Sequence, residues 1–156
     1  MNATASSFAN ADFARFALSL DPGIIPSSTR SFALAFDDVS AQVVLSHDER
    51  QVLTEFFVAD IAGLADARRD LVVKALLTLN ASGLEGRPFV CGLDSRDFVT
   101  VHGQTPLAGL DTARFAESFD YLLRQARRVR ELVGQLSFHN GGVTLVVPPA
   151  PTTGEQ

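Results

Sequence analysis

The feature that most constrains the fold is a long apolar stripe in the last third of the sequence. Its residues recur at alternating spacings of four and three, the repeat of one face of an α-helix. Leu110, Asp111 and Phe115 precede and open the stripe in the order of a hydrophobic staple around an N-cap. A helix that is apolar on one side only must lie on a second layer. The stripe consists of Phe115, Phe119, Leu122, Ala126, Val129, Val133 and Leu136.

Five other segments have the pattern of β-strands and supply that layer. In the first, Phe32, Leu34 and Phe36 alternate with small residues, so one face is bulky and the other nearly bare. Acidic turn residues separate the first three strands, which predicts a sequential antiparallel meander. The segment Asp94–Asp97 favours a hairpin between the last two strands. The expected strands span residues 31–37, 41–46, 51–59, 87–93 and 98–103.

Two further helices are expected, over residues 10–20 and 67–81, the second with Asp66 as its cap. The second helix is apolar on more than one side, because Val73 and Leu77 fall beside its main apolar face. Such a surplus favours association with another chain. The main apolar face consists of Leu71, Val72, Ala75, Leu76 and Leu79.

These elements predict an α+β fold: a twisted, mainly antiparallel sheet of about five strands with three helices, in the order α-β-β-β-α-β-β-α. With 156 residues, 46% of them hydrophobic, one domain over residues 1–137 is expected. Residues 138–156 are rich in glycine and proline and are expected to form a mobile tail, or to add an edge strand at residues 143–147.

Charge and composition exclude several classes of partner. The net charge of −5 repels nucleic acid and anionic membranes. Arg124, Arg127, Arg128 and Arg130 indicate a solvated helix face with local ion pairs, such as that of Arg127 with Glu131. The longest uncharged run contains glycines and prolines, so no membrane helix is expected, and the N-terminus lacks the pattern of an export signal. We therefore expect a cytoplasmic protein without membrane insertion.

Catalytic, metal and cofactor sites find little support. The three histidines lack metal-ligand spacing, and no phosphate-binding loop is present, so neither a metal nor a cofactor is expected. Cys91 alternates with Phe89 and Leu93, which predicts a buried, inert thiol. A small hydrolase or transferase with acids and His102 in a cleft stays open, and it requires converging polar groups in a pocket.

The chain resembles the class I type III secretion chaperones of the Tir chaperone (CesT-like) family in the order of its elements and in four local features. These features are the run Leu71–Asn80, the following Gly83, the strand end at Leu93-Asp94, and Leu110 before the last helix. The resemblance covers residues 8–136. The chain departs from it in its long tail and in Gly63 and Ala65, where such chains often carry proline.

The resemblance implies a non-enzymatic homodimer that binds the N-terminal segment of secreted effectors, keeps it soluble and delivers it to the secretion apparatus. A regulatory adaptor that binds a transcription factor or a secretion component is the alternative. By the resemblance, the cargo-binding candidates are Phe13, Phe16, Leu18, Phe32, Leu34 and Phe36. The candidates for the dimer interface are Val73, Leu77, Phe89 and Cys91.

Overall fold

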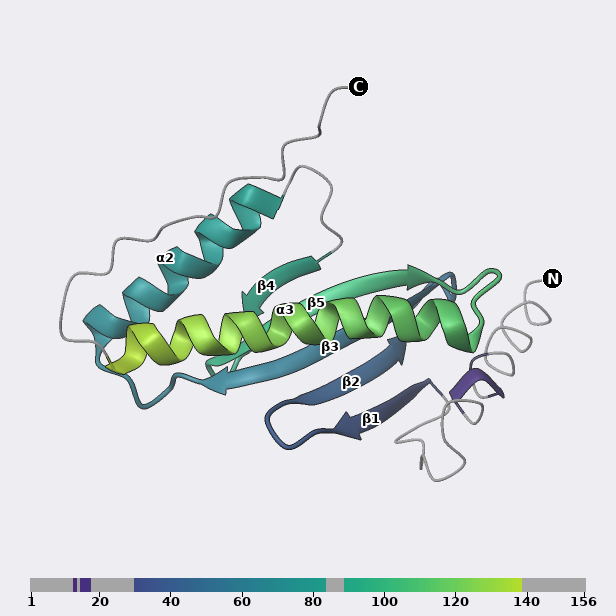
Figure 1. The fold of residues 1–156 in the computed structure, drawn as a ribbon, viewed down its shortest axis with the longest axis horizontal. Helices are drawn as coiled ribbons and strands as arrows, with labels where there is room; N and C mark the ends of the chain where they lie inside the picture. The colour runs from purple at the N-terminus through teal and green to yellow at the C-terminus, as the bar shows by residue number, and fades with distance from the viewer. Residues whose placement is uncertain (1–12, 14, 18–29, 84–88, 139–156) are drawn as a thin grey trace, which may run out of the picture.

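The computed structural model describes residues 13, 15–17, 30–83 and 89–138, which form a five-stranded sheet with helices on one side (Figure 1). All four strand pairings are antiparallel. The expected α+β class and element order are confirmed. The elements are β1 (Ser31–Ala35), β2 (Ser40–Leu45), β3 (Gln51–Asp60), α2 (Asp66–Gly83), β4 (Phe89–Leu93), β5 (Phe98–Pro106) and α3 (Thr112–Phe138).

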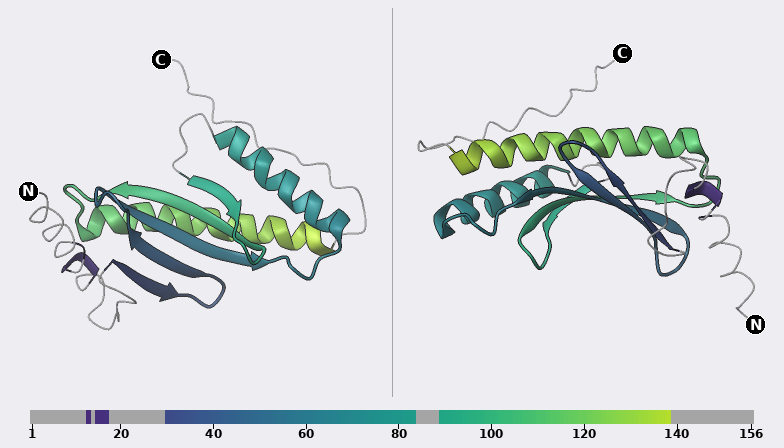
Figure 2. Two further views of the ribbon diagram at one scale, coloured as in Figure 1. Left: turned by 180° about the vertical axis from the view of Figure 1, so that it is seen from behind. Right: turned by 90° about the horizontal axis from the view of Figure 1, so that it is seen from below.

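The strand order is β1-β2-β3-β5-β4, so β1 and β4 are the two edges of the sheet. The first three strands form the expected meander, and β4 and β5 form the expected hairpin. Helix α2 connects β3 to β4 and lies beside β4, at the edge opposite β1 (Figures 1 and 2).

Helix α3 lies across one face of the sheet, as the apolar stripe requires (Figure 2, right). All seven residues of the stripe are buried. The Asp111 carboxylate accepts a hydrogen bond of 2.8 Å from the Arg114 backbone N–H, which confirms the predicted cap. Gly103 of β5 allows the close approach of α3, because a Cβ there would lie 2.5 Å from Cδ1 of Leu122.

The N-terminal helical segment, Phe13 and residues 15–17, packs at the β1 end of the sheet. The Phe13 ring lies 5.7 Å from the ring of Phe32 in β1, and the Phe16 ring 4.8 Å from that of Phe115 in α3. The segment therefore joins the sheet to the start of α3. The rest of the helix expected over residues 10–20 lies outside the described residues, as does the tail with its expected strand at 143–147.

Two expectations for α2 are wrong in detail. The Ala65 carbonyl accepts a hydrogen bond from the Arg69 N–H, so Ala65 and not Asp66 occupies the cap position, and Asp66 opens the first turn. Leu71 was expected on the core face, yet 48% of it is exposed. Only the side of the helix that carries Val72, Ala75 and Leu76 is packed against the rest of the protein. The apolar side of the helix is wider than this packed side, and Leu71 lies on the part that is not packed.

Candidate functional site

Among the described residues, no strand pairs with the outer side of β1 at Ala33 and Ala35. The Phe36 N–H donates to the Val39 carbonyl and the Leu45 N–H donates to the Arg30 carbonyl, so the even-numbered residues face β2. Hydrogen-bonding direction alternates along an antiparallel strand, so Ala33 and Ala35 direct their N–H and C=O groups away from the sheet. Their side chains are small and exposed. This side of β1, the β1 edge, has the geometry that a further strand needs.

An apolar surface adjoins the β1 edge. Leu34 is half-buried, and 38% of Phe36 is exposed although its ring lies 5.8 Å from that of Phe119 in α3. Both side chains lie on the sheet face that α3 covers. Exposed aromatic surface beside an open backbone edge offers a ligand both apolar contact and hydrogen bonds.

A cavity of about 350 Å³ lies at the N-terminal end of α3. Phe16 of the N-terminal helical segment forms part of its wall, so the cavity borders the same end of the molecule as β1. Its mixed polar and apolar lining suits a side chain with both characters. The lining residues are Arg15, Phe16, Leu107, Gly109, Leu110, Asp111 and Thr112.

The six predicted cargo residues separate into different environments. Phe13, Phe16 and Phe32 are buried and pack the helical segment onto the sheet and α3, so they expose almost no surface to a ligand in this conformation. Leu34 and Phe36 keep accessible surface. Leu18 lies outside the described residues.

The β1–β2 turn is fastened to α3 by two arginines. The Arg127 guanidinium donates to both carboxylate oxygens of Asp38, at 2.9 and 3.2 Å. Arg130 donates to the Asp38 and Val58 carbonyl oxygens. The hydrogen bond from Arg127 lowers the pKa of Asp38. The local pairing of Arg127 with Glu131 is thus replaced by a contact that joins α3 to β1, and sequence spacing alone gives no sign of it.

A second exposed apolar surface lies where α2 meets β4. Leu77 is 62% exposed and Val90 57% exposed, and Val73 is half-buried. The Asn80 side chain holds the two elements together, because its amide nitrogen donates to the Cys91 carbonyl and its oxygen accepts from the Cys91 N–H, both at 2.8 Å. Leu77 lies one turn before Asn80, and we call Val73, Leu77 and Val90 the α2–β4 surface.

Two of the predicted interface residues lie on the inner side of β4. Phe89 is half-buried and packs against Tyr121 of α3, with the ring centroids 6.3 Å apart. Cys91 is 4% exposed, and burial raises its pKa to about 11, so the thiol stays protonated at neutral pH. Sequence reasoning missed Val90. The alternation that put Phe89 and Cys91 on one face could have revealed it, because it puts Val90 on the other.

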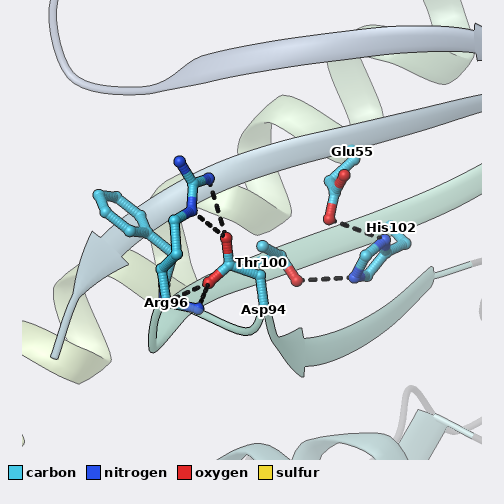
Figure 3. A network of polar contacts seen from close by, with 6 residues as sticks. Glu55, Asp94, Arg96, Thr100 and His102 are labelled. Carbon is cyan, nitrogen blue, oxygen red and sulfur yellow. Dashed lines mark hydrogen bonds and ion pairs between the residues drawn. The ribbon is translucent and has the colours of Figure 1, made fainter. Parts of the chain in front are cut away.

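A polar network lies on the sheet face opposite α3 (Figure 3). Thr100 Oγ1 lies 2.7 Å from His102 Nε2, and Glu55 Oε1 lies 3.6 Å from His102 Nδ1. The order hydroxyl, imidazole, carboxylate resembles a nucleophilic triad, but Thr100 is 1% exposed and its hydroxyl is closed to a substrate. The network therefore satisfies the buried Thr100 hydroxyl and gives the enzyme alternative no support.

The acidic residues near this network form a turn. The Asp94 carboxylate accepts hydrogen bonds from the backbone N–H groups of Arg96 and Phe98 and from the Arg96 guanidinium, and the bond from Phe98 contributes most to lowering its pKa (Figure 3). Their expected role as turn residues is confirmed.

Within the described ranges, no three histidine, cysteine or acidic side chains are grouped to hold a metal ion. None of the helices in the described part of the chain combines the length and apolarity that crossing a membrane requires.

The chain belongs to the Tir chaperone protein (CesT) family, whose profile matches residues 14–130. The resemblance drawn from the sequence is thereby confirmed. No curated protein sequence matches the chain.

Solved structures of other proteins share the fold, among them the following three. The structure of the ExsC–ExsE complex is 23% identical with a TM-score of 0.64, over 85% of this chain and 97% of that one. The HopA1–SchA chaperone–effector complex is 12% identical with a TM-score of 0.63, over 80% of this chain and 97% of that one. The Yersinia pestis type III secretion chaperone SycH, in complex with a stable fragment of YscM2, is 14% identical with a TM-score of 0.55, over 78% of this chain and 98% of that one.

Proposed function

We propose that this chain is a cytoplasmic type III secretion chaperone that binds the N-terminal segment of a secreted effector and keeps it competent for export. The observation that carries the proposal is the outer side of β1 at Ala33 and Ala35, which no described strand pairs with, beside exposed Phe36 in a member of the CesT family. Among proteins of the same fold, SchA occurs in a chaperone–effector complex. The proposal involves no catalytic step, and it ends with delivery of the effector to the secretion apparatus.

The effector segment binds in an extended form. Its backbone pairs with Ala33 and Ala35, and its apolar side chains cover Leu34 and Phe36. Burial of apolar surface on both partners contributes ~25 cal/mol per Å², less the cost of ordering the segment. The cavity at the start of α3 takes one further side chain of the segment. The bound segment is kept from aggregation because its apolar side chains are covered.

Two copies form a homodimer through the α2–β4 surface. Leu77 and Val90 are the two most exposed large apolar residues among those described, and a second copy would cover them. Because β1 and β4 lie at opposite edges of the sheet, this contact leaves both β1 edges of the dimer accessible (Figure 1). One dimer therefore offers two sites to effector segments.

The test is co-expression with the N-terminal segment of an effector encoded beside the gene for this chain. Leu34→Asp with Phe36→Asp places two charges where apolar side chains of the effector must pack, and should weaken binding at least about tenfold. The matched control is Leu71→Asp, which changes an equally apolar, half-exposed residue on α2, far from β1.

Binding is measured by titration of the purified segment into each variant, with circular dichroism as the check of folding. Retained affinity in the double variant would contradict the proposed site. A wild-type chain that binds transcription factors or secretion components and no effector segment would assign the adaptor role instead.

A further inference from the structure

The two edges of the sheet are not equivalent, and the difference begins with the direction of the β4 backbone. The Asp94 N–H, just after β4, donates to the carbonyl of Phe98, the first residue of β5, 3.0 Å away, so the even-numbered residues of β4 face β5. By alternation, Phe89, Cys91 and Leu93 direct their N–H and C=O groups outward. β4 would thus be a second template for strand addition if nothing covered it.

The centre of this outer side is already occupied. Asn80 makes two hydrogen bonds of 2.8 Å to Cys91, one to its N–H and one to its carbonyl oxygen. A side-chain amide has one donor and one acceptor side, as a backbone peptide group does, so Asn80 takes the place of one residue of a neighbouring strand. At the β1 edge, by contrast, Ala33 and Ala35 have no such side-chain partner among the described residues.

Asn80 is held in this position by its helix. Val72, Ala75 and Leu76 of α2 are buried, and Asn80 itself is half-buried against β4. A strand that paired with β4 would have to break both hydrogen bonds to Cys91 and move α2 away from the sheet. The half-buried Asn80 amide would lose both of these partners, which adds a further cost.

We propose that Asn80 closes the β4 edge to strand addition and so determines that an extended segment joins the sheet at β1. The assignment of β1 rests on the function proposed above; the closure of β4 does not. A second copy of the chain then docks on the α2–β4 surface through side chains and does not continue the sheet from β4 to β4. Asn80 is a specificity-determining residue in this sense, because it selects one of two chemically similar edges.

The test replaces Asn80 in the full chain and measures assembly without any effector. Asn80→Ala removes both hydrogen bonds, so the Cys91 amide should exchange its hydrogen about fivefold to tenfold faster. Loss of both hydrogen bonds also loosens the contact of α2 with β4, so the β4 edges of two assemblies should then pair, which raises the weight-average mass about twofold above that of the wild type at high concentration. Thr78→Ala is the matched control, since Thr78 is exposed on the same helix and donates only to the Lys74 carbonyl.

A second set of variants separates edge pairing from partial unfolding. Leu93→Pro removes an outward N–H from the same side of β4. The double variant Asn80→Ala with Leu93→Pro should therefore return to the wild-type mass. Asn80→Asp keeps the acceptor for the Cys91 N–H and loses the donor, so its mass should lie between those of the wild type and Asn80→Ala.

A folded Asn80→Ala variant with fast Cys91 exchange and an unchanged or smaller mass would overturn the proposal. So would a larger mass that Leu93→Pro fails to reverse. If Asn80→Ala does not fold, the mass and the Cys91 exchange of Asn80→Asp are compared with those of the wild type instead, because this variant loses only one of the two hydrogen bonds. Because no effector is present, none of these results depends on whether β1 binds one.

Discussion

Acidic side chains organise the turns of this protein. Asp48 accepts hydrogen bonds from Ser46 and from the Arg50 N–H, and Asp94 makes the corresponding contacts in the β4–β5 turn. Asp38 differs, because its partner Arg127 comes from another element. All three carboxyl groups have a lowered pKa, and hydrogen bonding to the charged form is the largest cause in each case.

Asp38→Asn is expected to make stability less sensitive to acid. A carboxyl whose folded pKa is below its ordinary value of 3.8 stabilises the fold above that pH, and the contribution is lost as the pH falls through the lowered value. The loss of thermal stability between about pH 5 and pH 3 should therefore be smaller in Asp38→Asn than in the wild type. Asp37→Asn, which removes the same charge from the exposed neighbouring residue, is the control. Equal acid sensitivity of the two variants would show that the contact with Arg127 contributes nothing.

At the scale of elements, the contact of α3 with the sheet carries most of the core. Leu122 of α3 is buried directly over Gly103 of β5, and Phe119 packs against Phe56 of β3 with the rings 5.0 Å apart. Interiors are close-packed, so this contact has no room for an added methyl group. The glycine in β5 is thus a packing requirement of α3.

Gly103→Ala is expected to destabilise the protein by about 1–3 kcal/mol, because the added Cβ would force the buried Leu122 side chain to move. Gly134→Ala is the matched control within α3. Nothing lies within 4 Å of a Cβ at Gly134, so alanine there should stabilise the helix by about 0.5–1 kcal/mol. Denaturant unfolding measures both. A neutral Gly103→Ala would mean that α3 adjusts its distance from the sheet.

The predictability of each element follows from the range of the interactions that define it. The α3 stripe and the Asp111 cap were predicted correctly because both depend on residues a few positions apart. The partner of Arg127 was not predicted, because Asp38 lies 89 residues away in the sequence and only the folded sheet brings the two residues together.

The same reason limits prediction of the functional surfaces. Helical periodicity marked Leu77 as surplus to the core, and it is exposed. Periodicity gave the same apolar character to Phe32 and Phe36, yet one is buried and the other accessible, since the position of the N-terminal helical segment and α3 decides which ring is covered. Asn80 gave no signal at all, because its role is a contact with a different element.

At the scale of the whole molecule, the sheet separates two surfaces. The β1 edge lies at one end of the strand order and the α2–β4 surface at the other. α3 spans the sheet between them (Figure 1). In the proposed function, a second copy at one edge and an effector segment at the other would therefore not compete.

The double variant Leu77→Asp with Val90→Asp is expected to yield a folded monomer. Hot-spot residues at the centre of an interface contribute about 2 kcal/mol or more, so two charges at such positions should raise the dimer Kd at least about 30-fold. Leu71→Asp, on the other flank of the same helix, should leave the dimer intact. Sedimentation velocity measures all three chains. An unchanged dimer in the double variant would place the contact elsewhere.

Amide hydrogen exchange at Ala33 and Ala35, with and without a bound N-terminal effector segment, tests strand addition at β1 most directly. These two N–H groups point away from the sheet, so strand addition at β1 must slow their exchange. New protection is expected at both alanines and none at the outward groups of β4. Full binding of the segment with unchanged exchange at Ala33 and Ala35 would contradict strand addition at β1.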